Sequence, residues 1–80
     1  MLLKDVEVGA RLGKARSTIW DDVRQGTVTE PIRRGLKWSR WPSDEIDAIE
    51  RAIVAGASDD QLRALVKRLT EARAAGGVAA

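Results

Sequence analysis

The residues best suited to chemistry lie in one short stretch, residues 33–41, which reads RRGLKWSRW. It combines cations, which bind phosphates, with two indole rings that stack on other groups. No acid lies within it, and the first one that follows is Asp44. This composition indicates electrostatic binding of a polyanion. The side chains expected to contact phosphates are Arg33, Arg34, Lys37 and Arg40.

Covalent catalysis has little support in the sequence. The chain contains neither histidine nor cysteine, which removes the commonest general base and any thiolate nucleophile or metal ligand. No pair of carboxylates stands out as an acid and a base. We therefore expect a protein that is not an enzyme and that needs neither a metal nor another cofactor.

Charge is distributed unevenly along the 80 residues, whose formal net charge is +2. Residues 1–41 contain nine Lys/Arg and five Asp/Glu, a net +4, whereas residues 42–80 contain five and seven, a net −2. A basic front half is typical of a protein that binds nucleic acid. A solvated surface without a partner is the alternative that charge alone leaves open.

Nothing in the sequence points to a membrane partner. No apolar run approaches the roughly 18 residues of a membrane span. The N-terminal stretch MLLKDVEVGARLG carries charges too early and too often for a signal peptide. The expected location is therefore the cytoplasm.

Two helices that must support the basic stretch are predicted after it. In residues 43–56, Ser43 is the expected N-cap and Gly56 the expected stop. The helix from residue 58 begins with a capping box of Ser58 and Gln61. The expected apolar stripes are Ile46, Ile49 and Ile53 in the first helix, and Leu62, Leu65, Val66 and Leu69 in the second.

The second of these helices has two possible roles. Its apolar stripe either packs on the small core or contacts a partner, such as another copy of the chain or a recombinase. The expected organisation is a domain of residues 1–56, an amphipathic helix of residues 57–75, and a flexible tail of residues 76–80.

The first half of the chain predicts two shorter helices. Residues 2–13 place Leu3, Val6 and Ala10 on one face, with Gly13 as the stop. Residues 15–26 place Ile19 and Val23 on one face, with a second glycine stop at Gly26. Two short helices joined by a glycine-containing turn are typical of a helix-turn-helix.

A β-hairpin is predicted next, over residues 31–41. Because side chains alternate along a strand, Trp41 and Ser39 should point inward, and Trp38 and Arg40 outward. Trp41 then belongs to the core, and Trp38 is free to press on a sugar-phosphate backbone or on an adjacent copy. The alternative is that Trp38 folds back over the domain's own apolar surface.

Three stretches together have the order and spacing of a known family. They are LLKDV at residues 2–6, GKARSTIW at residues 13–20 and PIRRGLKWSRW at residues 31–41, and a helix beginning PSDEIDAI follows. In these stretches, over roughly residues 2–50, the chain resembles the AlpA and excisionase-like regulators, which are small winged-helix proteins related to the MerR DNA-binding domain. The implied fold is mostly α with a small β-hairpin wing, a winged helix-turn-helix in the order helix, helix, hairpin, helix, helix.

The resemblance implies that the second helix enters the major groove of DNA. Arg16 is the expected reader of guanine, and the wing is expected to hold the flanking backbone. A solvated helix face is the alternative. The residues expected to meet DNA from this helix are Arg16, Ser17, Thr18, Trp20, Asp21 and Arg24.

Three residues depart from the family pattern. Ala15 stands where an N-cap Ser is usual, which forfeits about 1 kcal/mol of capping. Asp21 and Asp22 follow the aromatic residue, where the family often has basic or apolar residues. Asp21 is able to accept from a cytosine amino group, but repulsion of phosphates is the favoured role for both acids, and more strongly for Asp22.

The resemblance implies a mobile-element or prophage context. The expected function is that of an excisionase, or recombination directionality factor, which binds adjacent DNA sites and bends them. The alternatives are an AlpA-like transcriptional regulator at a promoter, and an antitoxin-like or adaptor module that uses the last helix. The expected partners are double-stranded DNA, further copies of the chain, and an integrase, a recombinase or RNA polymerase.

Overall fold

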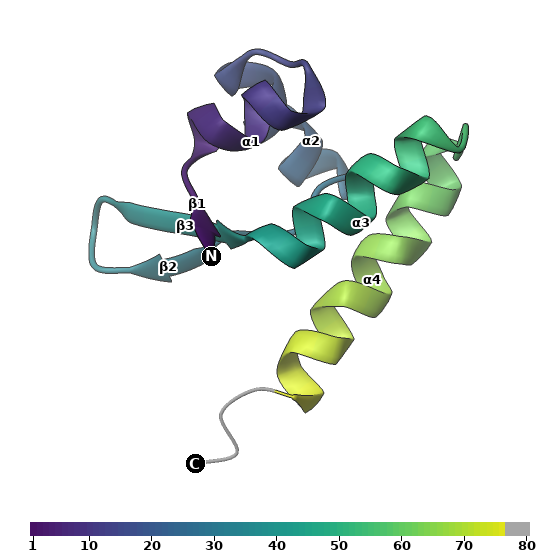
Figure 1. Cartoon of the computed structure of the whole chain (residues 1–80). Helices are drawn as coiled ribbons and strands as arrows, with labels where there is room; N and C mark the ends of the chain where they lie inside the picture. The colour runs from purple at the N-terminus through teal and green to yellow at the C-terminus, as the bar shows by residue number, and fades with distance from the viewer. Residues whose placement is uncertain (77–80) are drawn as a thin grey trace.

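The computed structural model describes residues 1–76. The chain is mostly helical, with one small three-stranded antiparallel sheet. Figure 1 shows the hairpin projecting to one side of the helices, while the last two helices run along the other side. The elements are β1 (Leu2–Leu3), α1 (Asp5–Leu12), α2 (Arg16–Gln25), β2 (Ile32–Arg34), β3 (Trp38–Pro42), α3 (Ser43–Val54) and α4 (Asp59–Ala75).

The expected order of two helices, a hairpin and two helices is confirmed, but the sheet contains a further strand. Its strand order is β1-β3-β2, and Leu3 pairs with Trp41. The prediction that Leu3 lies on a helix face was wrong. The two residues of β1 add to the free edge of β3, and this pairing places Leu3 in the core.

The predicted core face of α1 was also wrong. Val6 and Ala10 are exposed, and Val8 and Gly9 are buried instead. Because Leu3 belongs to β1, the helix begins at Asp5 and has little more than two turns. Two turns hold too few apolar residues for periodicity to define a face, so packing against α2 selects it.

Most of the predicted helix ends are confirmed. Gly13, Gly26 and Gly56 all have positive φ angles, of 69°, 83° and 85°. These left-handed conformations are open to glycine at little cost and end the helices. Ser58 and Gln61 form the predicted capping box, with distances of 2.8 and 3.2 Å between donor and acceptor.

Ser43 is not the N-cap that was expected. Pro42 occupies that position without a side-chain hydrogen bond, and Ser43 is the first residue of α3. The backbone amide of Ser43 donates instead to the carbonyl of Met1, at 2.9 Å. The chain therefore passes straight from the sheet into the helix, and the Met1 carbonyl satisfies an amide at this end of α3.

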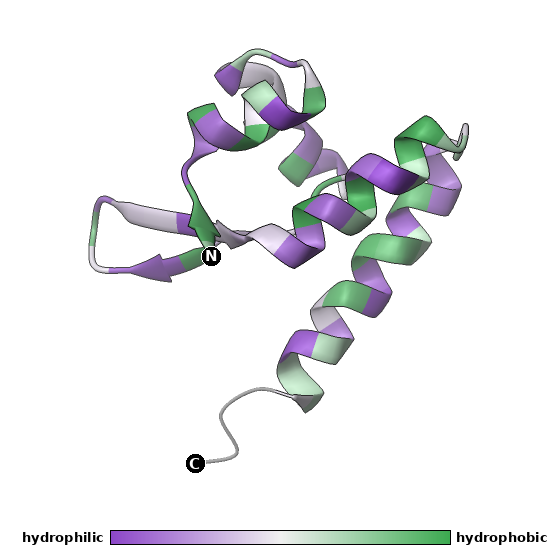
Figure 2. Ribbon diagram, viewed as in Figure 1, coloured by the Kyte–Doolittle hydropathy of each residue, from purple (hydrophilic) through white to green (hydrophobic). Residues whose placement is uncertain are grey.

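One core joins all four helices to the sheet. Trp41 is fully buried, as predicted, and Ile53 is exposed although it was expected on the apolar face of α3. The hydrophobic colour in Figure 2 alternates with hydrophilic colour along α3 and α4, as in helices with one covered face. The buried apolar residues are Leu3, Val8, Ile19, Val23, Val28, Trp41, Ile46, Ile49 and Leu62.

The last helix packs on this core. Leu62 is buried, and Leu65, Val66 and Leu69 are half-buried against the core residues. Near its C-terminal end, Arg73 donates to both carboxylate oxygens of the buried Glu45. Leu62 thus belongs to the same core as the predicted domain of residues 1–56.

The flexible tail predicted for residues 76–80 lies outside the described residues, except for Gly76, which caps α4. None of the helices in residues 1–76 is both long and apolar enough to cross a membrane.

Candidate nucleic-acid interface

The register of the hairpin divides its side chains between two faces. Arg33 pairs with Ser39 and Arg34 pairs with Trp38, and the connecting turn contains Gly35 with a φ of 70°. Because side chains alternate, Arg33 and Ser39 share the face of Trp41, which is the face toward the helices. Arg34, Trp38 and the following Arg40 occupy the outer face.

The contact between Trp38 and Arg40, two residues apart on the same strand, follows the predicted alternation of side chains. The Arg40 guanidinium carbon lies 5.0 Å from the centroid of the Trp38 ring. A cation at this distance over an indole face is attracted by the ring quadrupole. Trp38 is half-buried rather than fully exposed. Arg40, which lies over its ring, is a cation that is itself able to bind phosphate.

The exposed surface of α2 holds four of the six predicted contact residues. Arg16, Ser17, Asp21 and Arg24 are exposed, and Thr18 is half-buried. Arg24 donates to the carboxylate of Asp21 one turn away. As predicted, Ala15 at the N-cap provides no side-chain hydrogen bond, so amides of the first turn lack a side-chain cap there.

Trp20 was expected to project from α2 toward DNA, but its ring turns toward the core instead. It is half-buried, and its ring centroid lies 5.2 Å from that of Trp41 at an interplanar angle of 58°. Its Nε1 donates to Oδ2 of Asp5, at 3.1 Å. The indole is long enough to reach sideways from its position next to Ile19 and to cover part of the core, which contains no Phe or Tyr.

Asp22 was expected to face DNA and repel phosphates, and this was wrong. Its side chain is only 12% exposed, and its Oδ2 accepts from Nζ of Lys14 at 2.6 Å. Its backbone carbonyl accepts from the amide of Thr27, at 3.0 Å, in the turn that follows α2. Asp22 therefore has a structural role, and Asp21 is the acid of this pair that is exposed.

Asp5 is a site residue that the sequence did not reveal. Its Oδ2 accepts from Nε of Arg16 at 2.7 Å as well as from Trp20. Burial raises the pKa of Asp5, but hydrogen bonds from Trp20, Arg16 and a backbone amide outweigh it, so this pKa lies below its usual range. Arg16 follows Asp5 by eleven positions in the sequence, and only the packing of α1 on α2 brings them together.

The hairpin and α2 meet at Trp20. The Arg33 guanidinium carbon lies 5.7 Å from the centroid of the Trp20 ring, and Arg33 also pairs with Glu30 at 3.4 Å. One cation of the predicted wing therefore lies against the predicted reading helix. Arg34, Lys37 and the fully exposed Leu36 remain at the tip of the hairpin.

A cavity of about 270 Å³ lies between the hairpin and α2. Four of the side chains that line it are cationic and one is acidic, which makes it an electropositive groove beside the exposed end of α2. It brings residues of the predicted reading helix and the predicted wing to one place. Its lining residues are Lys4, Asp5, Arg16, Trp20, Leu36, Lys37, Ser39 and Arg40.

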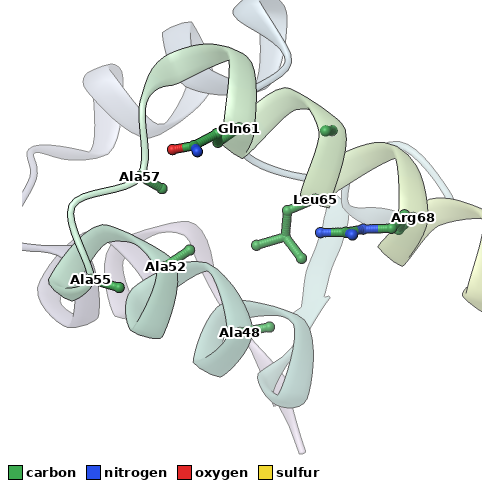
Figure 3. A pocket seen from close by; sticks show the side chains of 8 residues that line it. Ala48, Ala52, Ala55, Ala57, Gln61, Leu65 and Arg68 are labelled. Carbon is green, nitrogen blue, oxygen red and sulfur yellow. The ribbon is translucent and has the colours of Figure 1, made fainter.

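A larger cavity of about 610 Å³ lies between α3 and α4. Figure 3 shows Ala48 and Ala52 of α3 on one side and Leu65 and Arg68 of α4 on the other. Its walls are mostly small apolar side chains with a polar edge. Among the predicted stripe residues of α4, only Leu65 lines it.

Within residues 1–76, no group of three or more His, Cys, Asp or Glu side chains is arranged so that it could hold a metal ion. No family model, curated protein or solved structure matches this chain.

Proposed function

We propose that this protein binds duplex DNA as a winged helix-turn-helix, with α2 in the major groove and the β2–β3 hairpin as the wing. The observation that carries the proposal is the electropositive cavity between the two elements. The DNA backbone that borders the major groove occupied by α2 would pass this cavity. Its phosphates would there meet cations of α2 on one side and of the hairpin on the other.

The exposed first turn of α2 suits insertion into the groove. Arg16 and Ser17 are exposed at the end of the helix where the backbone amides point outward. Helix N-termini favour anions, and arginine is the commonest side chain in specific contacts to guanine. In this pose Arg16 reads bases, and Ser17 and Thr18 bind phosphates or thymine methyl groups.

The hairpin suits the flanking backbone. Arg34 and Lys37 are exposed on either side of its tip, and they are attached to a strand pair whose base is fixed by the burial of Trp41. A short, rigid element with cations at its end binds phosphates without sequence preference. In this arrangement the wing holds the DNA backbone, and α2 recognises the base sequence.

Within this function, we favour an excisionase, or recombination directionality factor, of a prophage or integrative element. Trp38 and Arg40 share one face of the hairpin, and in this function the exposed part of that face would contact an adjacent copy on DNA. Several copies bound side by side would offset a bending cost of about 1–6 kcal/mol. An AlpA-like promoter regulator would use the same DNA-binding surfaces.

A second candidate function has one observation in its favour. The apolar cavity between α3 and α4 would suit a module that binds another protein, such as an integrase, a recombinase or RNA polymerase. That function leaves the basic cavity beside α2 without a role, and for this reason it ranks second.

The test is a titration of duplex DNA at a series of salt concentrations. Six cations lie on α2 and the hairpin: Arg16, Arg24, Arg33, Arg34, Lys37 and Arg40. If about six phosphates are neutralised, log K should fall against log salt with a slope of about −5.

The matched comparison is between charge removals on two faces. Arg34→Ala and Lys37→Ala should each reduce the magnitude of the slope by about 1. Lys67→Ala and Arg68→Ala, which remove the same charge from exposed positions on α4, should leave the slope unchanged. Absence of binding at low salt, or equal effects on the two faces, would contradict the proposal.

A further inference from the structure

Arg16 is held at one nitrogen and free at the others. Its Nε donates to Oδ2 of Asp5 at 2.7 Å, although 68% of the arginine side chain is exposed. Neither terminal nitrogen of Arg16 has a hydrogen-bond partner anywhere in residues 1–76. This contact favours one orientation of the guanidinium, while Nη1 and Nη2 remain available to an external acceptor.

Asp5 is itself fixed from three sides. Its side chain is only 21% exposed, its Oδ2 also accepts from Trp20 Nε1, and its Oδ1 accepts from the amide of Val6 at 2.8 Å. Trp20 in turn packs on Trp41, which is fully buried and donates to the carbonyl of Thr29 at 2.7 Å. A continuous set of contacts thus runs from the core to the guanidinium.

We propose that Asp5 is a positioning residue that holds Arg16 for bidentate recognition of a guanine edge; this inference rests on the proposed DNA-binding function. Bidentate recognition of O6 and N7 needs two parallel N–H donors in one plane. Nη1 and Nη2 provide them while Nε stays on Asp5. A free arginine side chain would lose rotamer entropy on binding, whereas a pre-oriented one has already lost most of it.

The lowered pKa of Asp5 supports this role. The carboxyl is ionised at neutral pH, so it holds the cation with a charge-assisted hydrogen bond. A competing role has the opposite sign. If Asp5 were an internal substitute for phosphate that has to be displaced, its removal would strengthen binding to every DNA sequence.

The first experiment compares Asp5→Asn with Glu7→Gln. Both remove one carboxylate from the first turn of α1, but Glu7 accepts from the amide of Lys4 at 2.8 Å and does not touch Arg16. The preferred duplex is first selected from a random library with the parent protein. The dissociation constants of parent and variants are then measured for this duplex and for a random duplex of equal length.

Asp5→Asn is expected to lower the ratio of specific to random affinity roughly tenfold, with little loss of affinity for random DNA. Glu7→Gln is expected to keep the parental ratio. If Asp5→Asn keeps the parental ratio, or if both variants lower it equally, the inference is overturned while the proposed function stands. If Asp5→Asn instead strengthens binding to both duplexes, the displacement role replaces it.

A second measurement separates positioning from a purely structural effect. In an Arg16→Ala background, Asp5→Asn should change the ratio no further, because the side chain that it positions is gone. A further tenfold loss in that background would overturn the inference. Melting curves of all variants establish that they are folded, and a parent protein that binds no duplex at low salt overturns the inference together with the proposed function.

Discussion

The indole rings of Trp20 and Trp41 pack against each other with their centroids 5.2 Å apart and their planes inclined by 58°. Trp20 belongs to α2 and Trp41 to β3, so this pair ties the proposed reading helix to the base of the proposed wing. Both surfaces that would meet DNA are thus held by the same small core. A substitution that loosens this pair should disturb the two surfaces together.

The two tryptophans of the hairpin should differ sharply in their effect on stability. Trp41→Ala removes a fully buried ring and is expected to cost about 3–5 kcal/mol, a large part of the stability of so small a domain. Trp38→Ala should change the melting temperature little, since Trp38 lies on the outer face with Arg40, but it should weaken DNA binding or the cooperativity of adjacent copies. Thermal melting with binding isotherms on short and long duplexes measures both effects. Equal loss of stability in the two variants would place Trp38 in the core.

Substitutions on α2 and on the wing should weaken DNA binding in different ways. Arg16→Ala should cost about 1–3 kcal/mol on the preferred site and relax its sequence preference, because Arg16 is the proposed base reader. Arg34→Ala should weaken preferred and random duplexes alike, because it removes an exposed wing cation. Competition binding against random DNA measures the difference. The same specificity ratio in both variants would show that the division between reading and anchoring is wrong.

Gly9→Ala should destabilise the protein although Gly9 lies within a helix. Alanine normally favours a helix over glycine by about 1 kcal/mol. Here a Cβ atom would lie 2.5 Å from the backbone carbonyl oxygen of Lys14, and relief of this clash would have to separate α1 from the start of α2. The expected net loss is about 1–3 kcal/mol, measured by chemical denaturation. Val6→Ala on the exposed face of α1 is the control, with an expected change within about 0.5 kcal/mol, and a rise in stability for Gly9→Ala would contradict the close approach.

The ion pair between Arg73 and Glu45 should be important for the attachment of α4. The side chain of Glu45 is only 7% exposed, so Arg73→Ala would leave a buried carboxylate without its cation. The expected cost is about 3 kcal/mol, and Glu45→Gln in the same chain should recover part of it. Arg68→Ala, on the same helix at an exposed position without an ion pair in the described residues, should have little effect. If Arg73→Ala and Arg68→Ala melt at the same temperature, α4 is not held by this pair.

Acid should remove the contribution of Asp5 to stability. Because the pKa of Asp5 is lowered in the folded state, its contribution is fully present above the unfolded value of about 3.9 and is lost as the pH falls through the lower folded value. Asp5→Asn lacks this titrating group. The melting temperature of this variant should therefore fall less than that of the parent between pH 7 and the acid range below about pH 4. An identical fall in the two proteins would contradict the hydrogen bonds assigned to this carboxylate.

The sequence by itself determined the features that depend on neighbouring residues. The glycine stops and the capping box of Ser58 and Gln61 follow from backbone conformation and hydrogen bonds within a turn. The burial of Ile19 and Val23 follows from their spacing of four residues, which places both on one face of α2. The opposite orientation of Trp38 and Trp41 follows from the alternation of a strand. The order of helices and hairpin was predictable because each element has its own local pattern of apolar residues and its own stop residue.

Only the tertiary structure decided the contacts between residues far apart in the chain. Leu3 lies in a strand and not in the predicted helix because it pairs with the edge of β3 at Trp41. Trp20 turned inward because the core had space beside Trp41, and Asp22 turned inward toward Lys14. Asp5 of α1 contacts Arg16 of α2, and the helical periodicity of three or four residues does not predict a contact between residues eleven positions apart. Side chains at the edge of a helical face are assigned by the space and the charges that another element offers, and these exist only once the elements have packed.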